Sequence, residues 1–243
     1  MEKLLKCDIS ETSEYFNKAF SPGGKWETNN GRNQTRRFAE CFVWNTKIPF
    51  EEFLLLDVGC ALGDAAPVLH KAYPKARLYG CDVSQVAIDR CKEDYGHIAE
   101  FFRAGFEDIQ GFWDVIYCSN VLEHFEEYKK IASWLLNKCN VLYIMTPFFE
   151  LKNGQPLNPK VETGHKVTLY QNSFDEFYKE GFLSLPIKTK TIRCPKAWSP
   201  PLLKEISREI RRGIKMIVFR RYFPPRMRQI IYELRNKDYI QNE

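Results

Sequence analysis

An apolar strand that runs directly into a glycine turn is the feature that most constrains how this chain can fold. Residues 53–56 are Phe-Leu-Leu-Leu, Asp57 follows, and Gly59 and Gly63 bracket a tight turn. The apolar periodicity of residues 65–72 then predicts a helix. Strand, turn and helix together predict a nucleotide-binding crevice, because a Cβ in the turn would keep the backbone away from a ligand. Asp57 beside the turn disfavours a phosphate and favours a cationic or hydroxyl-bearing ligand.

A second predicted strand, 76–81, ends in Asp82, which lies nineteen residues after Gly63. At this spacing, an acidic residue that closes the next strand receives the ribose hydroxyls of a nucleoside. Similar patterns predict strands at 99–103, 114–120, 141–145 and 182–192, and helices at 85–95, 126–138 and 172–180. The alternation of strands and helices predicts a doubly wound α/β sheet in a single domain.

The composition predicts a soluble protein of the cytoplasm. No apolar run in the 243 residues is long enough to span a bilayer, and the first residues lack the long apolar core of a signal peptide. The eight cysteines include no C-x-x-C pair, so we expect reduced core thiols and neither a zinc site nor a disulfide framework.

Basic residues are concentrated near the carboxyl terminus. Residues 201–243 hold eleven Lys and Arg against five Asp and Glu, a net charge of +6, whereas the whole chain carries +5. A basic tail of this kind suggests an anionic partner, such as a sugar nucleotide, a lipid-linked phosphate, nucleic acid or a membrane surface. A solvated basic helix without a partner is the alternative.

In their order, these motifs resemble the class I S-adenosylmethionine (SAM)-dependent methyltransferases. The resemblance is carried by LLLDVGCALG, LYGCDVS, AGFEDI, WDVIYCSNVLEHF and VLYIMTPF, within about residues 50–190. It implies a Rossmann-like seven-stranded sheet, mostly parallel with an antiparallel last strand, which we expect at 214–219. It also implies SAM as the cofactor and S-adenosylhomocysteine (SAH) as the product. Another doubly wound nucleotide binder is the alternative.

The resemblance assigns cofactor-binding residues to the glycine turn and to the ends of the next three strands. They are Asp57, Gly59, Cys60, Gly63, Asp82, Val83, Phe106, Glu107, Asp108, Ser119 and Asn120. Many relatives carry an acid two residues after the third strand, where it reaches the adenine amino group, but this chain has Gly105 there. Glu107, Asp108 or the backbone around Phe106 is left to hold adenine.

The chain divides into an amino-terminal helical lid segment (1–48), a SAM-binding core (49–192) and a carboxyl-terminal extension (193–243). The extension is expected to supply a substrate-cap helix, the last strand and a basic closing helix at 224–237. Within the first segment, the polar stretch 22–36 is a candidate lid over the cofactor, with an ordinary surface loop as the alternative. The candidate substrate-binding residues are Trp26, Gln34, Glu123, Arg193 and Lys196.

Two histidines are candidates for the catalytic base. His124 follows the fourth strand and His165 lies in the long loop after the fifth, so both belong to the edge where open α/β sheets place reacting groups. His165 is the expected general base, and either histidine could instead be structural. Relatives that act on quinone precursors or small RNAs hold a divalent ion with an acid-x-x-Glu-His pattern and a later histidine. Here Asn120 replaces the first acid, which favours metal-independent base catalysis over a Mg²⁺ site.

These observations favour a SAM-dependent O-methyltransferase that acts on a saccharide or a similarly hydroxylated small molecule, in surface-glycan or natural-product assembly. A run of the type GH followed by an aromatic, a small polar residue, EF and GF, as in residues 164–182, is found in methyltransferases that modify sugars and quinone precursors. The rival functions are an N-methyltransferase acting on an amino sugar, an RNA methyltransferase and a non-catalytic SAM-binding protein. Nucleic acid is disfavoured because the basic excess is confined to the tail. A lipid-linked acceptor, peripheral membrane contact and a homodimer stay open.

Overall fold

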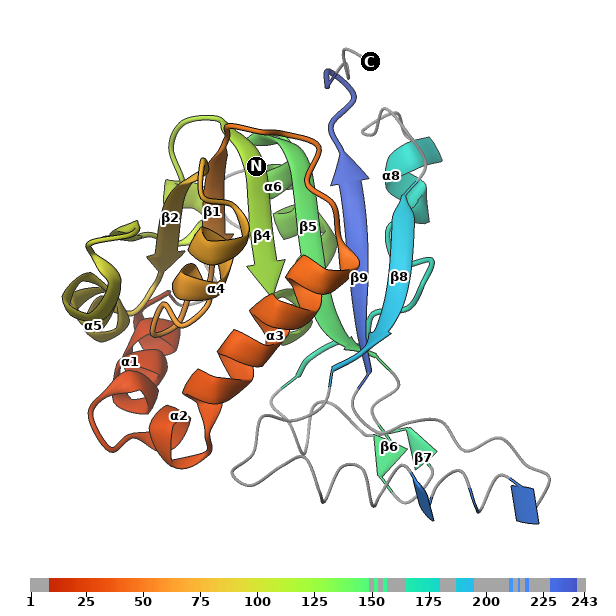
Figure 1. The fold of residues 1–243 in the computed structure, drawn as a ribbon, viewed down its shortest axis with the longest axis horizontal. Coiled ribbons are helices and arrows are strands. Elements are labelled where there is room, and N and C mark those ends of the chain that lie inside the picture. The colour runs from red at the N-terminus through yellow and green to blue at the C-terminus, as the bar shows by residue number, and fades with distance from the viewer. Residues whose placement is uncertain are drawn as a thin grey trace.

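A seven-stranded sheet with helices on both faces forms the framework of the molecule (Figure 1). The computed structural model describes residues 9–148, 151–152, 155–156, 165–179, 187–194, 210–211, 214, 217–218 and 228–239. The strands of the large sheet are β1 (Leu54–Val58), β2 (Arg77–Asp82), β3 (Glu100–Arg103), β4 (Trp113–Ser119), β5 (Cys139–Phe148), β8 (Lys188–Arg193) and β9 (Arg228–Arg235). Two short strands, β6 (Leu151–Lys152) and β7 (Gln155–Pro156), form a separate hairpin.

The strand order is β3-β2-β1-β4-β5-β9-β8. Pairing is parallel from β3 through β5, while β9 runs antiparallel to both of its neighbours, β5 and β8. The chain reverses its winding direction between β1 and β4, because β2 and β3 extend the sheet to one side of β1 and the later strands to the other. Ligands of open α/β sheets bind beyond the carboxyl ends of the strands at such a reversal. The predicted doubly wound, mostly parallel sheet is confirmed.

Helices cover both faces of this sheet. The helical segments are α1 (Ile9–Phe20), α2 (Lys25–Thr28), α3 (Gly31–Asn45), α4 (Ala66–Ala72), α5 (Gln85–Tyr95), η1 (Phe106–Asp108), η2 (Leu122–His124), α6 (Tyr128–Leu136) and α8 (Asp175–Lys179). On one face Phe42 of α3 packs against Tyr117 and Tyr143 of the central strands, with ring centroids 4.5 and 5.2 Å away. On the other face the core contains Leu135 of α6 and Phe177 of α8.

Local sequence signals placed most of the central elements correctly. Helix α5 spans the predicted residues, and the Ser84 hydroxyl caps it by accepting a hydrogen bond from the Ala87 N–H at 3.1 Å. Leu55 and Leu56 of β1 are fully buried, as expected for a strand covered on both faces. The predicted lid stretch 22–36 is largely helical rather than a loop, because it contains α2 and the first turns of α3.

The predicted last strand was wrong. The antiparallel strand beside β5 is β9, whereas the described residues within 214–219 are helical. The basic closing helix predicted at 224–237 was wrong for the same reason. Ile230, Tyr232 and Leu234 face one side of the sheet and Ile231 faces the other, so β9 is buried on both faces. This burial, together with the strand preference of β-branched and aromatic residues, outweighs the flanking charges that suggested a helix.

Hydrogen bonds and an ion pair hold the amino-terminal helices α1 and α2 against the core. Ser13 of α1 donates to the Val83 carbonyl at 3.1 Å, and the amide oxygen of Asn17 accepts from the Ser84 hydroxyl at 2.7 Å. Arg90 of α5 donates to the Phe20 carbonyl at 2.9 Å and pairs with Glu27 of α2. These bonds hold α1 and α2 against the segment that directly follows β2.

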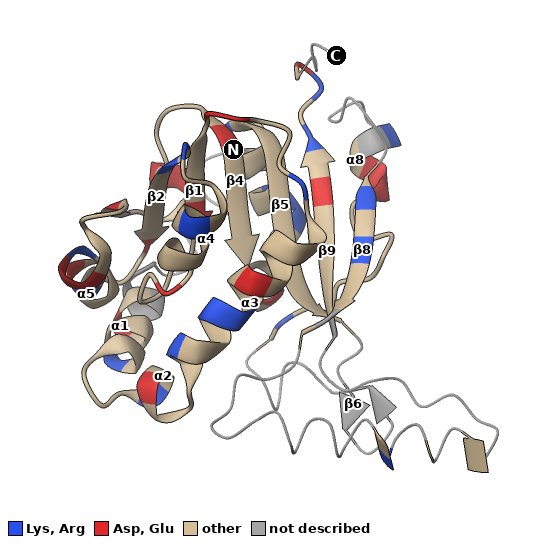
Figure 2. Cartoon of the chain, in the orientation of Figure 1, with Lys and Arg blue, Asp and Glu red and all other residues tan. Residues whose placement is uncertain are grey.

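A buried carboxylate joins α3 to the core. Asp64, which is fully buried after the glycine turn, accepts from Arg32 Nε at 2.9 Å, from an Arg36 terminal nitrogen at 3.0 Å and from the Tyr95 hydroxyl at 2.8 Å. Figure 2 shows the basic residues in the first half of α3. One carboxylate therefore pairs with two guanidinium groups from the helix that covers it.

We expect Asp64→Ala to lower the free energy of unfolding by about 3 kcal/mol, because it leaves the guanidinium groups of Arg32 and Arg36 without their buried counter-charge. Urea denaturation followed by circular dichroism measures the change. The control is Asp94→Ala, since the Asp94 side chain is about one-third exposed and pairs with Arg32 alone. Its cost should be at most about 1 kcal/mol. Equal losses for the two variants would contradict this role for Asp64.

The cysteines behave as core residues. The seven cysteines in the described part of the chain are all buried, as expected for core residues. Among the described helices, none has the length and apolar character needed to cross a bilayer.

Candidate functional site

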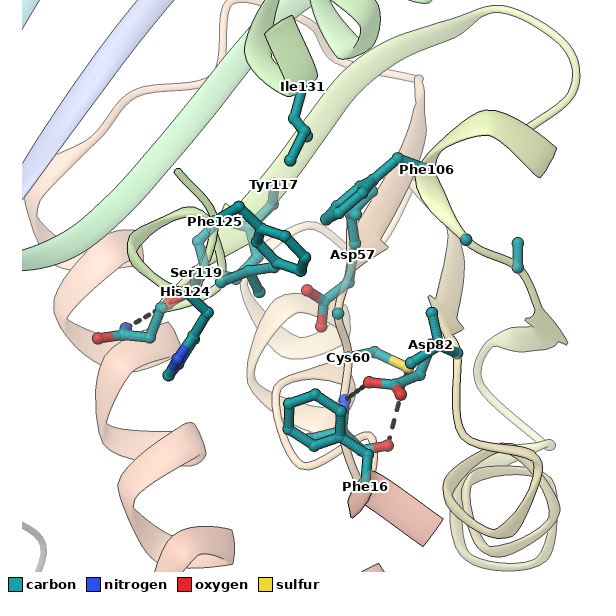
Figure 3. A pocket seen from close by; sticks show the side chains of 18 of the residues that line it. Phe16, Asp57, Cys60, Asp82, Phe106, Tyr117, Ser119, His124, Phe125 and Ile131 are labelled. Atoms are coloured by element: carbon teal, nitrogen blue, oxygen red, sulfur yellow. Dashed lines mark hydrogen bonds between the residues drawn. The ribbon is translucent and has the colours of Figure 1, made fainter. Parts of the chain in front are cut away.

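A cavity of about 280 Å³ lies at the carboxyl edge of the central strands, beneath the amino-terminal helices (Figure 3). Its walls come from the glycine turn, the ends of β2 and β4, the loops that follow β3 and β4, and helices α1–α3 and α6. The predicted site residues that line it are Asp57, Gly59, Cys60, Asp82, Val83, Phe106, Glu107, Ser119, Asn120, His124 and Trp26. Residues from four separate parts of the predicted site thus meet at one cavity.

The glycine turn is held against β2 by its own backbone. The N–H groups of Gly59 and Cys60 both donate to the Cys81 carbonyl, at 2.8 and 3.0 Å. Gly59 has φ +75°, and a Cβ there would lie 2.5 Å from Cγ2 of Val121. Glycine is therefore required at this position by both its backbone conformation and the close approach of the loop after β4.

Gly63, which the resemblance assigned to cofactor binding, lies against α5. It has φ +72° and does not line the cavity. A Cβ there would lie 3.0 Å from Cys91 Sγ and 3.1 Å from the Tyr95 ring. The absence of a side chain at Gly63 lets α5 approach the turn closely.

Two acidic side chains, Asp57 and Asp82, face the cavity side by side in Figure 3. The Asp82 carboxylate accepts from the N–H groups of Ala61 at 3.1 Å and Ser84 at 2.9 Å. Burial raises the pKa of Asp82 to about 6, although backbone hydrogen bonds from Ser84, Ala61 and Val83 oppose the shift. Burial and the neighbouring charge of Asp82 raise the pKa of Asp57 to about 7.

These raised pKa values mean that the folded protein holds protons that the unfolded chain has already released. Asp57 and Asp82 therefore contribute stability below about pH 4, and that contribution is lost as the pH rises through 6 and 7. At neutral pH the cavity contains partly ionised, poorly solvated carboxylates. A ligand that brings positive charge and hydroxyl donors to them would stabilise their ionised forms.

The loop after β3 forms an aromatic wall of the cavity. Phe106 packs edge-on against Phe125 with centroids 5.1 Å apart, and the Trp134 indole N–H donates to the Phe106 carbonyl at 2.8 Å. Glu107 lines the cavity, whereas Asp108 does not. The Asp108 carboxylate accepts from the Gly105 N–H at 3.1 Å and so closes its own turn. Of the two candidate acids in this loop, only Glu107 reaches the cavity.

The residue that follows β4 has an unusual backbone conformation. Asn120 has φ +56°, and its side-chain amide donates to the Ser119 hydroxyl at 2.9 Å. Its own N–H donates to the Met145 carbonyl at 2.7 Å. A left-handed conformation in a residue other than glycine is often found where a loop serves a functional site.

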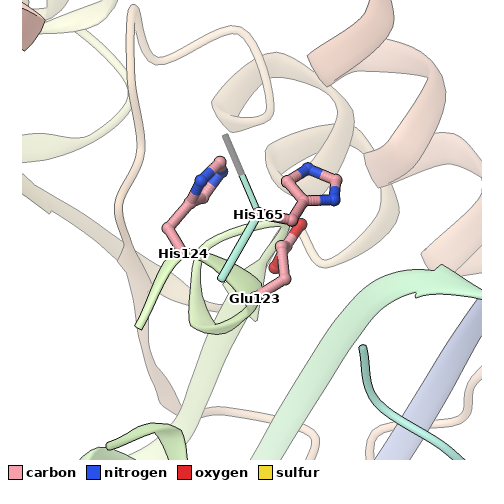
Figure 4. A group of neighbouring side chains, drawn as sticks. All are labelled: Glu123, His124 and His165. Atoms are coloured by element: carbon pink, nitrogen blue, oxygen red, sulfur yellow. The ribbon is translucent and has the colours of Figure 1, made fainter. Parts of the chain in front are cut away.

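Glu123, His124 and His165 come together beside the cavity (Figure 4). Each offers one ligand atom, and the three atoms all lie within 4.8 Å of one another. The two imidazole rings meet edge to face with centroids 4.9 Å apart. The Glu123 carbonyl accepts from the N–H groups of Lys166 and Val167, at 2.8 and 3.1 Å, which fixes the loop that carries His165. His124 lines the cavity, whereas His165 and Glu123 do not.

The remaining predicted substrate residues have different placements. Trp26 lines the cavity and packs edge-on against Phe20, with centroids 5.3 Å apart. Gln34 is half-buried on α3 and does not line the cavity. Arg193 ends β8, and only its backbone is described, while Lys196 lies outside the described residues.

Several cavity residues were not predicted from sequence as site residues. They are Phe16, Phe20, Thr35, Phe38, Val58, Ala61, Ala65, Ala104, Gly105, Tyr117, Val121, Phe125, Glu126, Glu127, Ile131, Trp134 and Lys166. Phe16 and Phe20 belong to the apolar face of α1, and an apolar face at helical spacing is also the pattern of ordinary core packing. A helix that covers a crevice and a helix that packs on a core have the same periodicity, so the sequence could not distinguish the two.

Comparison with known proteins agrees with this fold. Residues 56–142 match the family model described as a methyltransferase domain. The chain is 19% identical to the plantazolicin methyltransferase BpumL in complex with SAH, with a TM-score of 0.55 over 94% of this chain and 99% of that one. It is 16% identical to magnesium protoporphyrin IX methyltransferase from Synechocystis PCC 6803 with bound SAH, with a TM-score of 0.57 over 93% and 98%.

A third similar structure is a complex between the Haloferax volcanii Trm112 methyltransferase activator and the putative methyltransferase. It has a TM-score of 0.63, 12% identity, and coverage of 91% of this chain and 97% of that one. No match was found among curated proteins. At these identities the structural likeness establishes the methyltransferase fold, and the activity has to be argued from the site.

Proposed function

We propose that this protein transfers a methyl group from SAM to a hydroxyl of a saccharide or a similarly hydroxylated small molecule. The observation that carries the proposal is the meeting of the Asp57–Asp82 pair, the glycine turn and His124 at one cavity. The match to a methyltransferase domain model and the SAM or SAH bound in structural neighbours support the choice of cofactor. The neighbours are named for different substrates, so they indicate no single acceptor.

The cavity offers complementary groups for each part of SAM. The ionised carboxylate of Asp82 would accept from ribose hydroxyls, and Asp57 would attract the positive charge of the methionine portion. The aromatic wall of Phe106 and Phe125, with Glu107, would hold adenine. SAM supplies a methyl group already activated on a sulfonium. What the chain has to add is alignment of the acceptor and removal of its proton.

His124 is the proposed base because it is the histidine that lines the cavity. His165, which the sequence favoured as the base, does not line the cavity and would instead orient His124 through their ring contact. The aromatic side chains of Phe20, Trp26 and Phe38 line the same cavity and would pack against the face of a sugar or another ring. An N-methyl product, an RNA substrate and SAM binding without turnover are the competing outcomes.

A divalent ion is the alternative role for the histidine pair. One carboxylate and two imidazoles suit Mn²⁺, Fe²⁺ or Zn²⁺ better than Mg²⁺, which prefers oxygen ligands. Asn120 supplies no carboxylate where related metal-dependent enzymes have one. We therefore propose catalysis without a metal.

Calorimetric titration with SAM and SAH tests the cofactor assignment. We expect Asp82→Asn to weaken SAM binding by about 10- to 150-fold, because hydrogen bonds to a charged acceptor are worth about 1.5–3 kcal/mol. The control is Asp89→Asn, an exposed acid on α5 that accepts a hydrogen bond from Gln85. Absence of SAM binding to the wild-type protein would refute the proposal. Mass spectrometry of the methylated product then separates O-methyl from N-methyl transfer.

SAM affinity is expected to rise with pH. Since Asp57 has a pKa of about 7 in the unligated protein, only about a tenth of it is ionised at pH 6, and a cationic ligand must displace that proton. Binding at pH 6 should therefore be about tenfold weaker than at pH 8. Titrations in buffers of different ionisation enthalpy should show proton release on binding. Asp57→Asn should remove most of the pH dependence, and a wild-type affinity that is flat across this range would exclude Asp57 from the site.

A further inference from the structure

A long insertion interrupts what would otherwise be a simple hairpin between β8 and β9. The two strands are antiparallel neighbours, and Arg193 at the end of β8 pairs directly with Arg228 at the start of β9. Such strands need a connection of only about two to five residues. Here 34 residues, 194–227, separate them. Arg228 also pairs with Phe148 at the end of β5, so the insertion leaves the sheet at the edge that holds the cavity.

The described part of this insertion exposes an aliphatic stripe. Residues 210, 211, 214, 217 and 218 are helical. Ile210 is 58% exposed, Ile214 54%, Ile217 79% and Val218 65%. Positions separated by four, seven and eight residues lie on one face of a helix. Four large aliphatic side chains exposed in a row are unusual on a protein surface and mark an interaction site.

The charge of the insertion is strongly positive. It contains nine basic residues, at positions 196, 204, 208, 211, 212, 215, 220, 221 and 226, against two acidic ones, at 205 and 209. Its net charge of +7 exceeds the +5 of the whole chain, so the remainder is slightly acidic. In Figure 2 the described fragments of the insertion are blue and tan without red. An aliphatic stripe within a basic segment is the composition of helices that lie in the interface of an anionic bilayer.

We propose that the stripe formed by Ile210, Ile214, Ile217 and Val218, together with Arg211, docks on an anionic lipid surface. The aliphatic side chains would enter the boundary between headgroups and acyl chains, and the net positive charge of the insertion would attract lipid phosphates. The charge favours this occupant over a second copy of the chain, because two insertions of +7 would repel each other.

This docking surface does not depend on the proposed methyl transfer. It would, however, bring the edge of the sheet that holds the cavity toward the bilayer. Acceptors carried by a lipid would then meet the site without leaving the membrane.

Vesicle flotation with the full chain tests the proposal. We expect partition onto vesicles that contain phosphatidylglycerol, weak partition onto pure phosphatidylcholine, and loss of binding as salt is raised. Ile214→Asp combined with Ile217→Asp should reduce partition by at least about tenfold, the effect of withdrawing one large aliphatic side chain from an apolar environment. Arg211→Glu should reduce it by about fivefold or more. The control is Trp44→Asp on α3, since Trp44 is 70% exposed and lies far from the insertion in sequence.

Three results would overturn the proposal. The first is no preference for anionic over zwitterionic vesicles. The second is an aspartate variant that still partitions like the wild type. The third is a dimer in size-exclusion chromatography with light scattering that the aspartate variant dissociates, because the stripe would then be covered by a second copy.

Discussion

Replacing His124 with alanine is expected to lower the maximal turnover by about 10²- to 10⁴-fold, the usual contribution of a positioned general base. His124 lines the cavity and belongs to the segment just after β4, where reacting groups of this sheet type gather. An acceptor hydroxyl is almost entirely un-ionised at neutral pH, so its proton has to be removed as the methyl bond forms. SAM affinity should stay within about twofold, because the cofactor contacts assigned to Asp57 and Asp82 are untouched.

The pH profile distinguishes a base from a structural residue. An imidazole accepts a proton only when it is neutral, so the wild-type enzyme should lose activity on the acidic side, and His124→Ala should lack that limb. His165→Ala should lower turnover less and keep the limb, since His165 acts through its ring contact with His124. His70→Ala, on the exposed side of α4, is the matched control and should change nothing. Wild-type turnover in His124→Ala would show that this histidine has no catalytic role.

Chelator treatment separates base catalysis from the metal alternative. If EDTA leaves turnover unchanged, the cluster of Glu123, His124 and His165 acts without a metal. Inhibition by EDTA that Mn²⁺ or Zn²⁺ reverses would instead make these three side chains ligands and overturn the base assignment. The geometry is compatible with this second outcome, because one ligand atom from each of the three residues lies within 4.8 Å of the others.

The sequence predicted the part of the fold that local chemistry determines. Strand β1, the positive-φ glycine turn and α4 follow one another within twenty residues, and each has its own signal in burial pattern, glycine spacing or periodicity. The placement of Asp82 at the end of β2 follows from the same regularity. These elements can be predicted without knowing which distant segments of the chain they contact.

The sequence failed where the choice depends on a distant partner. The segments 214–219 and 230–234 are both short apolar runs, and either could be the last strand by composition. Only the second finds β5 and β8 on its two sides. The same limit applies to the histidines. Both were expected at the carboxyl edge. Which one lines the cavity depends on how the loop that carries His165 packs against η2, a contact that the sequence does not reveal.

Replacing Gly59 with valine is expected to weaken SAM binding by more than about 100-fold and to lower the free energy of unfolding by about 3 kcal/mol. The positive φ of +75° costs a residue with a Cβ about 1–2 kcal/mol, and overlap with Val121 Cγ2 at 2.5 Å adds about 1–3 kcal/mol. The new side chain would also enter the cavity wall. Gly111→Val is the matched control, because Gly111 has φ +79° with nothing within 4 Å of an added Cβ.

The control variant should show the backbone cost alone and bind SAM normally. A double substitution then tests whether contact with Val121 causes the additional loss of stability in the Gly59 variants. Gly59→Ala in a Val121→Ala background should regain stability relative to Gly59→Ala alone, because the shorter side chain at 121 removes the atom that the new Cβ meets. Simple additivity of the two substitutions would show that contact with Val121 is not the reason for glycine here, and the requirement would then rest on the backbone conformation and the approach of the ligand.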